Sequence, residues 1–211
     1  MANSNALKSY EGFLNSYHSW RKQASLAQKL LLTLGMAAVT GLAAQIQIPL
    51  PGTPVPITAQ TFAVLLSGVL LGRMWGGVSQ IIYVGLGALG LPWFAGMSGG
   101  SMVVFGATGG YLLGFVLAAF FLGTMTESPA GSKNYFSLIG LMWFASFVLI
   151  QVPGLSILAL WYQVTTGAVP SFQEILNLGL LPFVPGDVIK IILAASVAKV
   201  ALPKNSYAPQ S

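Results

Sequence analysis

The sequence predicts an all-α integral membrane protein with six transmembrane helices and both termini in the cytoplasm. Of its 211 residues, 55% are hydrophobic and only 6% are charged, and the mean hydropathy is +0.77. Soluble domains carry about 25% charged residues, so this chain cannot form a water-soluble surface. Only helices and closed barrels span a bilayer, and the ten-residue alternation of barrel strands does not occur in this sequence. Helices are therefore the expected structure.

Six hydrophobic segments have lengths near the roughly 20 residues that a helix needs to cross a bilayer, although the second is short. The proline-rich run 49–56 separates the first two, because closely spaced prolines cannot continue a helix. Pro153 and Gly154 are expected to kink the long fifth segment. The predicted spans are residues 27–48, 57–71, 75–91, 102–125, 136–165 and 183–202.

The distribution of basic residues supports six spans. In this arrangement the three loops 49–56, 92–101 and 166–182 lie on one side and contain no Lys or Arg. By the positive-inside rule the basic side is cytoplasmic, so both termini are expected there and the protein in the plasma membrane. The basic residues on that side are Lys8, Arg21, Lys22, Lys29, Arg73, Lys133, Lys199 and Lys204.

The two ends of the chain are expected to lie outside the helical domain, which covers residues 25–202. Residues 1–24 form an amphipathic leader, either a helix on the membrane surface or a poorly ordered tail. Residues 203–211 form a cytoplasmic tail. The pattern Ser171-Phe-Gln-Glu174 is a capping box, which predicts a short surface helix in the last outer loop.

Several kinds of chemistry are excluded by composition. The chain has no cysteine and one histidine, His18, so we expect neither a metal site nor thiol chemistry. Its basic residues are too sparse for a nucleic-acid surface. The glycine-rich run 106–110 lacks the lysine of a phosphate-binding loop. Acid–base groups are too few for an enzyme, and no cofactor is expected.

Asp187 and Lys190 are the two charges inside an otherwise uncharged hydrophobic stretch. A charge at the bilayer centre costs about 2.5–3.5 kcal/mol on insertion scales, so such residues usually face a partner or a polar cavity. Their i, i+3 spacing places both on one helix face, within mutual reach. The pair is predicted to bind a small polar ligand at the outer end of the sixth span. The alternative is a salt bridge that only fixes that helix.

Polar side chains of the second, third and fourth spans are further candidates. Gln60 carries two donors and an acceptor, and Thr58 lies beside it. These two residues either contact the ligand or form a hydrogen bond between helices. Tyr83 and Tyr111 carry hydroxyls that need partners if buried, in the pocket or on a neighbouring helix.

The loop 92–101 adds neutral candidates. Gly96 permits close backbone approach to a ligand, and Ser98 supplies a hydroxyl. Trp93 and Phe94 either form an apolar wall for a ring or anchor the loop at the membrane interface.

Four motifs resemble those of the BioY family, the biotin-specific substrate-binding (S) components of energy-coupling factor (ECF) transporters. They are Pro-Val-Pro-Ile-Thr-Ala-Gln-Thr at 54–61, Gly-Ala-Leu-Gly-Leu-Pro-Trp-Phe-Ala-Gly at 87–96, Gly-Ala-Thr-Gly-Gly-Tyr-Leu-Leu-Gly-Phe at 106–115 and Pro-Phe-Val-Pro-Gly-Asp-Val-Ile-Lys at 182–190. The resemblance spans roughly residues 25–202.

The resemblance implies a six-helix S component that captures biotin from outside beneath the three outer loops. It implies a transmembrane coupling subunit and two ATPase subunits as partners, although some family members are reported to work without a dedicated energising module. The coupling subunit is expected to dock on small residues of the first helix, here Ala37 and Gly41. Alternative functions are an S component for another small vitamin, or a membrane structural or assembly protein.

The pose of biotin stays open at this point. Asp187 is able to accept a hydrogen bond from a ureido N–H while Lys190 donates to the ureido carbonyl. Lys190 is equally able to bind the carboxylate of the valerate chain. The apolar ring and chain suit Trp93, Phe94 and Met97.

Overall fold

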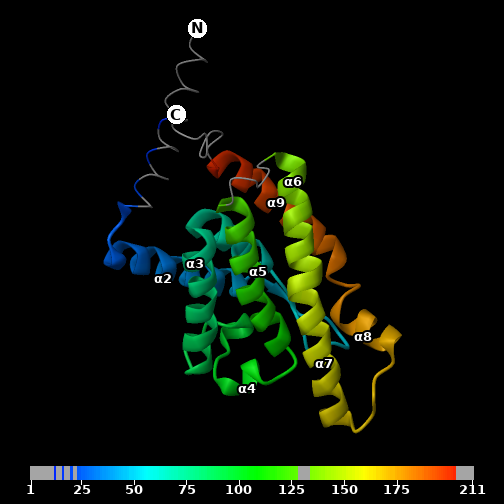
Figure 1. Cartoon of the computed structure of the whole chain (residues 1–211). Helices are drawn as coiled ribbons and strands as arrows, with labels where there is room; N and C mark the ends of the chain where they lie inside the picture. The colour runs from blue at the N-terminus through cyan, green and yellow to red at the C-terminus, as the bar shows by residue number, and fades with distance from the viewer. Residues whose placement is uncertain (1–11, 13–15, 17–19, 21–22, 128–133, 203–211) are drawn as a thin grey trace.

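The computed structural model describes residues 12, 16, 20, 23–127 and 134–202. Most of the predicted leader and all of the predicted tail 203–211 lie outside these residues. The described part is almost entirely helical, as the sequence predicts. Its longer helices are α2 (Leu26–Gln45), α3 (Gln60–Ala88), α5 (Gly109–Glu127), α6 (Tyr135–Phe144), α7 (Gln151–Thr166), α8 (Phe172–Gly179) and α9 (Val184–Ala201), arranged as in Figure 1.

Within the described residues, four helical stretches are long and apolar enough to cross a membrane. The fourth of them joins α6 to α7 through a π-helical segment, Ala145–Ile150. The number becomes five if α8 and α9, which meet at a bend of 50°, form one broken span. The protein is a multi-pass membrane protein.

The helix α3 contains a chain reversal at Gly72, where φ is +82° and ψ is −177°. A Cβ atom added to Gly76 would lie 2.7 Å from Gly68 Cα, so the two limbs of α3 run against each other. Gln60 and Tyr83 are hydrogen-bonded at 2.6 Å, whereas 23 residues of straight helix would separate them by about 35 Å. The structure thus separates the predicted second and third segments at the expected place (Figure 1).

Three predicted boundaries are wrong: the first segment ends at Gln45, the second starts at Gln60 and the fourth starts at Gly109. Residues 57–58 form a short strand, β2 (Ile57–Thr58), which pairs antiparallel with β1 (Gln47–Ile48) across the proline-rich loop. The fourth segment starts at Gly109, because the helix α4 (Ser101–Val104) ends in a tight turn. A Cβ at Gly109 would collide with the carbonyl of Val104, so glycine permits this turn.

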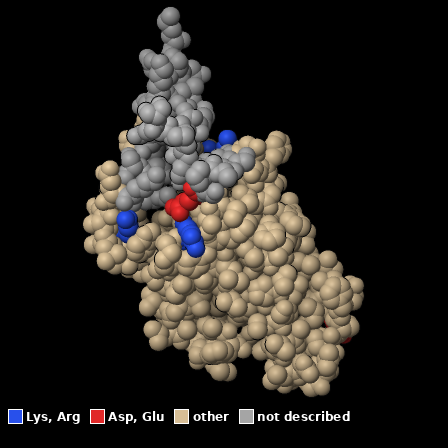
Figure 2. Space-filling model, viewed as in Figure 1, with Lys and Arg blue, Asp and Glu red and all other residues tan. Residues whose placement is uncertain are grey.

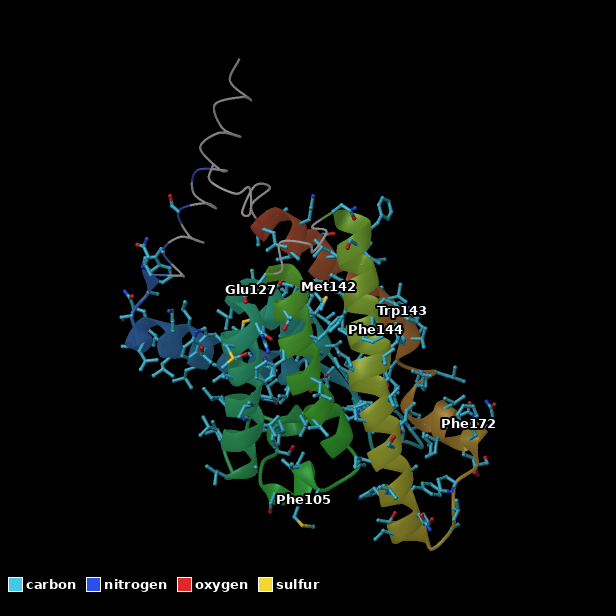
Figure 3. The ribbon with its side chains drawn as sticks, viewed as in Figure 1. Phe105, Glu127, Met142, Trp143, Phe144 and Phe172 are labelled. Carbon is cyan, nitrogen blue, oxygen red and sulfur yellow. The ribbon has the colours of Figure 1, made fainter. Side chains whose placement is uncertain are left out.

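The core lies around α5, which packs between the α3 hairpin and the α6–α7 stretch. Close contact with α3 depends on Gly68, since a Cβ there would lie 2.4 Å from the carbonyl oxygen of Ala119. Met142 points into this core, whereas Phe105, Trp143 and Phe172 are exposed (Figure 3). Such exposed apolar side chains are solvated by lipid tails in a membrane protein.

Charged side chains on the face in Figure 2 gather at the end of the molecule that carries the reversal in α3 and the end of α5. This end includes Glu127 at the end of α5 (Figure 3), whose carboxylate accepts a hydrogen bond from the backbone N–H of Arg73 at 3.1 Å. The opposite end carries α4 and the loop that leads to α8 (Figure 1). The fold therefore separates a charged end from an almost uncharged body.

Candidate ligand-binding site

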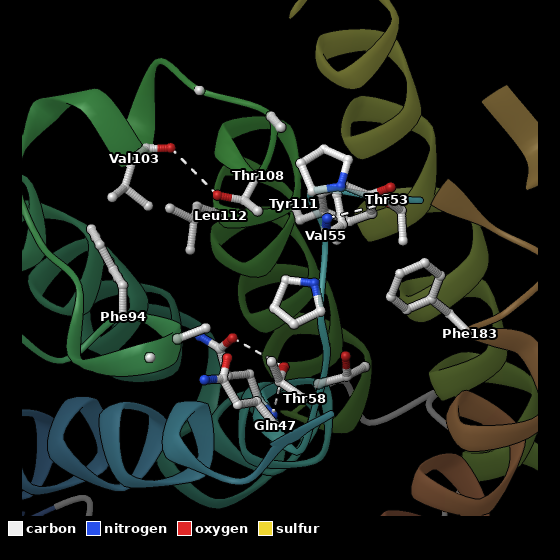
Figure 4. Close-up of a pocket in the computed structure, with 18 of the residues that line it drawn as sticks. Gln47, Thr53, Val55, Thr58, Phe94, Val103, Thr108, Tyr111, Leu112 and Phe183 are labelled. Atoms are coloured by element: carbon white, nitrogen blue, oxygen red, sulfur yellow. Dashed lines mark hydrogen bonds between the residues drawn. The ribbon is translucent and has the colours of Figure 1, made fainter. Parts of the chain in front are cut away.

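A cavity of about 510 Å³ lies among the proline-rich loop 49–56, the loop 92–101, and the helices α3, α5, α7 and α9. Pockets for small molecules typically have volumes of about 300–1,000 Å³. Phe94 and Leu112 line one side and Phe183 the other, while the proline-rich loop with Val55 runs between them (Figure 4). Nine of the ten residues predicted to bind substrate line this cavity: Thr58, Gln60, Tyr83, Phe94, Gly96, Ser98, Tyr111, Asp187 and Lys190.

Asp187 and Lys190 form the predicted contact, with 2.6 Å between Lys190 Nζ and Asp187 Oδ1. Asp187 lies in the first turn of α9, where the helix dipole favours a carboxylate. Lys190 Nζ also donates to the backbone carbonyl of Thr58 at 2.9 Å. The ammonium group has three hydrogens, so one donor remains for a molecule in the cavity. The salt bridge and a ligand contact are compatible in this geometry.

Gln151 completes the surroundings of Asp187. Its Nε2 donates to Asp187 Oδ2 at 3.1 Å, and its side chain is buried and lines the cavity. Both carboxylate oxygens therefore have a donor before any ligand enters. The sequence analysis missed Gln151, although an amide in the middle of a long apolar segment, two residues before Pro153, was a usable signal.

Gln60, Thr58 and Tyr83 form a connected polar group. Gln60 Nε2 donates to the Tyr83 hydroxyl at 2.6 Å, and the Thr58 hydroxyl donates to Gln60 Oε1 at 3.0 Å. These bonds join the ribbon β1–β2 to both limbs of α3. Both alternatives proposed for Gln60 are thus compatible, since it binds a neighbouring helix and also lines the cavity.

The proline-rich loop is fastened at both its base and its tip. The ribbon β1–β2 closes the base, and the hydroxyl of Thr53 donates to the carbonyl of Leu178 in α8 at 2.7 Å. The Tyr111 hydroxyl donates to the carbonyl of Gly179, also in α8, at 2.9 Å. The predicted capping box of α8 is confirmed, with Ser171 and Glu174 bonded reciprocally. This short helix therefore joins the loop to α5.

In the loop 92–101, Phe94 lines the cavity and Trp93 does not. The Trp93 indole N–H donates to the Tyr83 carbonyl at 2.9 Å, and the ring covers Gly41. Trp93 is therefore not a wall of this cavity, and its role as an interfacial anchor stays a prediction. Its ring instead packs against α2, because Gly41 leaves room for it.

The residues predicted to dock a coupling subunit are covered in this structure. Ala37 has no exposed surface, and Gly41 is buried beneath Trp93. The exposed side of α2 carries Leu34, Ala38 and Leu42 instead. The predicted small-residue pair therefore contributes to packing between α2 and the rest of the fold, and its docking role stays a prediction.

Comparison with known proteins gives consistent matches. A model of the BioY family matches residues 15–206. A probable biotin transporter BioY of Methanothermobacter thermautotrophicus is 52% identical over 142 residues, which are 67% of this chain and 90% of that protein. The biotin transporter BioY of Thermotoga maritima is 40% identical over 152 residues, which are 72% of this chain and 83% of that protein.

A crystal structure at 2.1 Å of the S-component for biotin from an ECF-type ABC transporter has a similar fold. The TM-score is 0.71 at 25% sequence identity, and the match covers 82% of this chain and 89% of that one.

Proposed function

The chain belongs to the BioY family, and from this premise we propose that it is the biotin-binding subunit of a vitamin uptake transporter. The observation that carries the proposal is the cavity, which places Asp187, Lys190 and Gln151 together beside apolar side chains. A bicyclic ureido ligand with an alkyl chain matches this combination. The protein is a transport subunit rather than an enzyme.

The proposed topology has six crossings with both termini in the cytoplasm of a plasma-membrane protein. The reversal at Gly72 divides α3 into two limbs, and α9 supplies the last span after the outer-loop helix α8. Together with α2, α5 and the α6–α7 stretch, these elements give six crossings. The gathering of charged groups beside the reversal in α3 and the end of α5 supports a cytoplasmic location for that end. The cavity then receives biotin from the extracytoplasmic side.

The proposed pose places the ureido ring at Asp187 and Lys190. A ligand carboxylate bound to Lys190 would lie beside the carboxylate of Asp187 and be repelled by it. The ureido group is neutral, and its N–H groups and carbonyl complement the Asp187 acceptor and the remaining Lys190 donor. Phe94, Leu112 and Phe115 line the cavity and suit the apolar ring and chain.

The proposed partners are a transmembrane coupling subunit and ATPase subunits of the ECF type. Lipid covers the exposed apolar surface of the helices. The proposed coupling contact remains on α2, and the exposed Leu34, Ala38 and Leu42 are accessible to a partner beside the buried pair Ala37 and Gly41. Copurification of ATPase subunits with the tagged chain tests this assignment.

A binding experiment on the purified full chain in nanodiscs tests the proposed ligand. We expect saturable binding of biotin without ATP and a rise in Tm, because a ligand that binds only the folded state stabilises it. A panel of other vitamins serves as the comparison. Stabilisation by a different vitamin alone would point to another substrate, and no stabilisation by any of them would contradict a carrier function.

A further inference from the structure

Gln151 Oε1 is a buried polar atom without a hydrogen-bond partner among the described residues. The residue is 4% exposed and lines the cavity. Buried side-chain acceptors are almost always hydrogen-bonded, so an unpartnered one in a native fold requires a reason. Its position in the wall of a ligand cavity suggests that the missing donor belongs to a ligand.

The orientation of the Gln151 amide follows from its neighbour. The carboxylate of Asp187 bonds to Lys190 and only accepts hydrogen bonds when ionised, so the NH₂ group of Gln151 must face Asp187 Oδ2. The carbonyl oxygen of the amide is then turned away from the carboxylate. A flipped amide would place two acceptors against each other, so the unpartnered Oε1 is a consequence of the salt bridge.

The backbone before Gln151 also departs from a regular helix. The π-helical segment Ala145–Ile150 ends immediately before Gln151. Pro153, two residues after Gln151, has no N–H to donate to the helix. Relative to an uninterrupted α-helix, one inserted residue turns the following side chains by about 100°. Such π segments frequently occur at functional sites, and this one immediately precedes the amide that lines the cavity.

We propose that Gln151 is a specificity-determining residue whose Oε1 accepts a hydrogen bond from an N–H group of the bound ligand. Its Nε2 simultaneously holds Asp187, so one side chain recognises the ligand and positions the carboxylate. The inference rests on the proposed function, in which the donor is one ureido N–H of biotin. Asp187 and Gln151 then each accept from one ureido nitrogen, and Lys190 donates to the carbonyl between them.

Two biotin analogues test this assignment, each with one ureido N–H replaced by an oxygen atom. The unaltered chain is expected to bind both analogues about 10- to 100-fold more weakly than biotin, because each leaves one buried acceptor without a donor. In Gln151→Met, biotin binding weakens by a similar factor. The ratio of the affinities for biotin and for the analogue that lacks the N–H facing Gln151 falls to less than about threefold. Discrimination against the other analogue persists.

The matched control is Gln80→Met. Gln80 is equally buried and has an unpartnered Oε1, but it lies outside the cavity, bonded to Thr40 and Ser79. This variant is expected to lower Tm while leaving the affinity for biotin and both analogues unchanged.

A purely positioning role predicts a different pattern. Gln151→Met would then weaken biotin binding but keep full discrimination against both analogues, and this result would overturn the proposal. Equal affinity of the unaltered chain for biotin and either analogue would overturn it too, even if the variant failed to fold. Absence of biotin binding by the unaltered chain would instead contradict the proposed function, and with it this inference.

Discussion

Gln45 shows how one side chain holds a wall of the cavity in place. From the end of α2, its Nε2 lies 3.2 Å from the carbonyl oxygen of Trp93 and 3.1 Å from that of Phe94. Its Oε1 accepts from the backbone N–H of Met97 at 3.0 Å. Met97 has a positive φ of 55°, which is uncommon outside glycine, so these contacts hold the loop in a strained conformation.

Gln45→Met is therefore expected to loosen the loop and weaken biotin binding about 3- to 10-fold, equivalent to about 0.5–1.5 kcal/mol for lost hydrogen bonds. The effect should appear mainly as faster dissociation, measured by release of labelled biotin. Gln163→Met is the control, since Gln163 is exposed near the end of α7. Equal dissociation rates for both variants and the unaltered chain would show that Gln45 does not support the site.

At the residue scale, the sequence identified Asp187 and Lys190 because a charge in an apolar segment is visible without a structure. The sequence shows Gln151 as an amide in an apolar segment, but its contact with Asp187 depends on the π turn before it and on a carboxylate 36 positions away. The packing of Trp93 was not predicted for a similar reason. Its packing against Gly41 joins residues far apart in the chain, and no local pattern encodes that contact.

Among the elements, the proline-rich loop 49–56 is the one most suited to cover the cavity. Pro49, Pro54 and Pro56 line the cavity, and Thr53 fastens the tip of the loop to α8. Proline restricts the free backbone, so holding this loop in place costs little conformational entropy. The bond from Thr53 to Leu178 is then a principal point at which the loop is held.

Thr53→Val keeps the shape of the side chain and removes the hydroxyl. The variant is expected to release biotin about 5- to 10-fold faster, because one hydrogen bond is worth about 1 kcal/mol. Thr165→Val is the matched control, since the Thr165 hydroxyl bonds only within its own helix. The assignment fails if both variants release biotin at the same rate as the unaltered chain.

The α3 hairpin depends on Gly72, whose backbone lies in a region that is essentially restricted to glycine. Gly72→Ala is expected to destabilise the protein by about 1–3 kcal/mol, measured as a lower Tm in detergent. Gly85→Ala is the control, because a Cβ there meets no atom within 4 Å and its φ is not positive. Equal Tm values for the two variants would contradict a glycine-dependent turn.

The sequence predicted helical elements well, because long apolar segments and prolines are local signals. It placed the start of the fourth segment too early, since the turn at Gly109 is formed by the backbone of Val104 and not by a helix-breaking proline. It missed the ribbon β1–β2, because two paired residues are too short to give an alternating pattern. Both errors lie at the cavity, where regular structure ends.

For the whole molecule, six crossings predict the sidedness of its loops. The chain has no cysteine, so an introduced cysteine is the one thiol of the chain that a labelling reagent is able to modify. Pro51→Cys and Val169→Cys are expected to react with an impermeant thiol reagent added outside intact cells. Met74→Cys, beside the reversal in α3, should react only after the membrane is opened. Outside labelling of Met74→Cys would contradict the six-span arrangement.

At the same scale, composition alone indicated a helical membrane protein, because so few charges exclude a water-soluble surface. The charge pair and the motifs indicated the type of ligand. The volume of the cavity and the set of side chains around it required the packed fold, since these side chains come from segments far apart in the chain.

The most direct test of the account is the biotin affinity of Asp187→Asn/Lys190→Met, measured by calorimetry on the full chain in nanodiscs. The double substitution removes both charges, so it avoids the cost of one buried unpaired charge. We expect the folded variant to bind biotin at least about 100-fold more weakly, because hydrogen bonds to charged groups contribute about 1.5–3 kcal/mol each. Unchanged affinity in a folded variant would show that the pair only fixes α9 and that the ligand binds elsewhere.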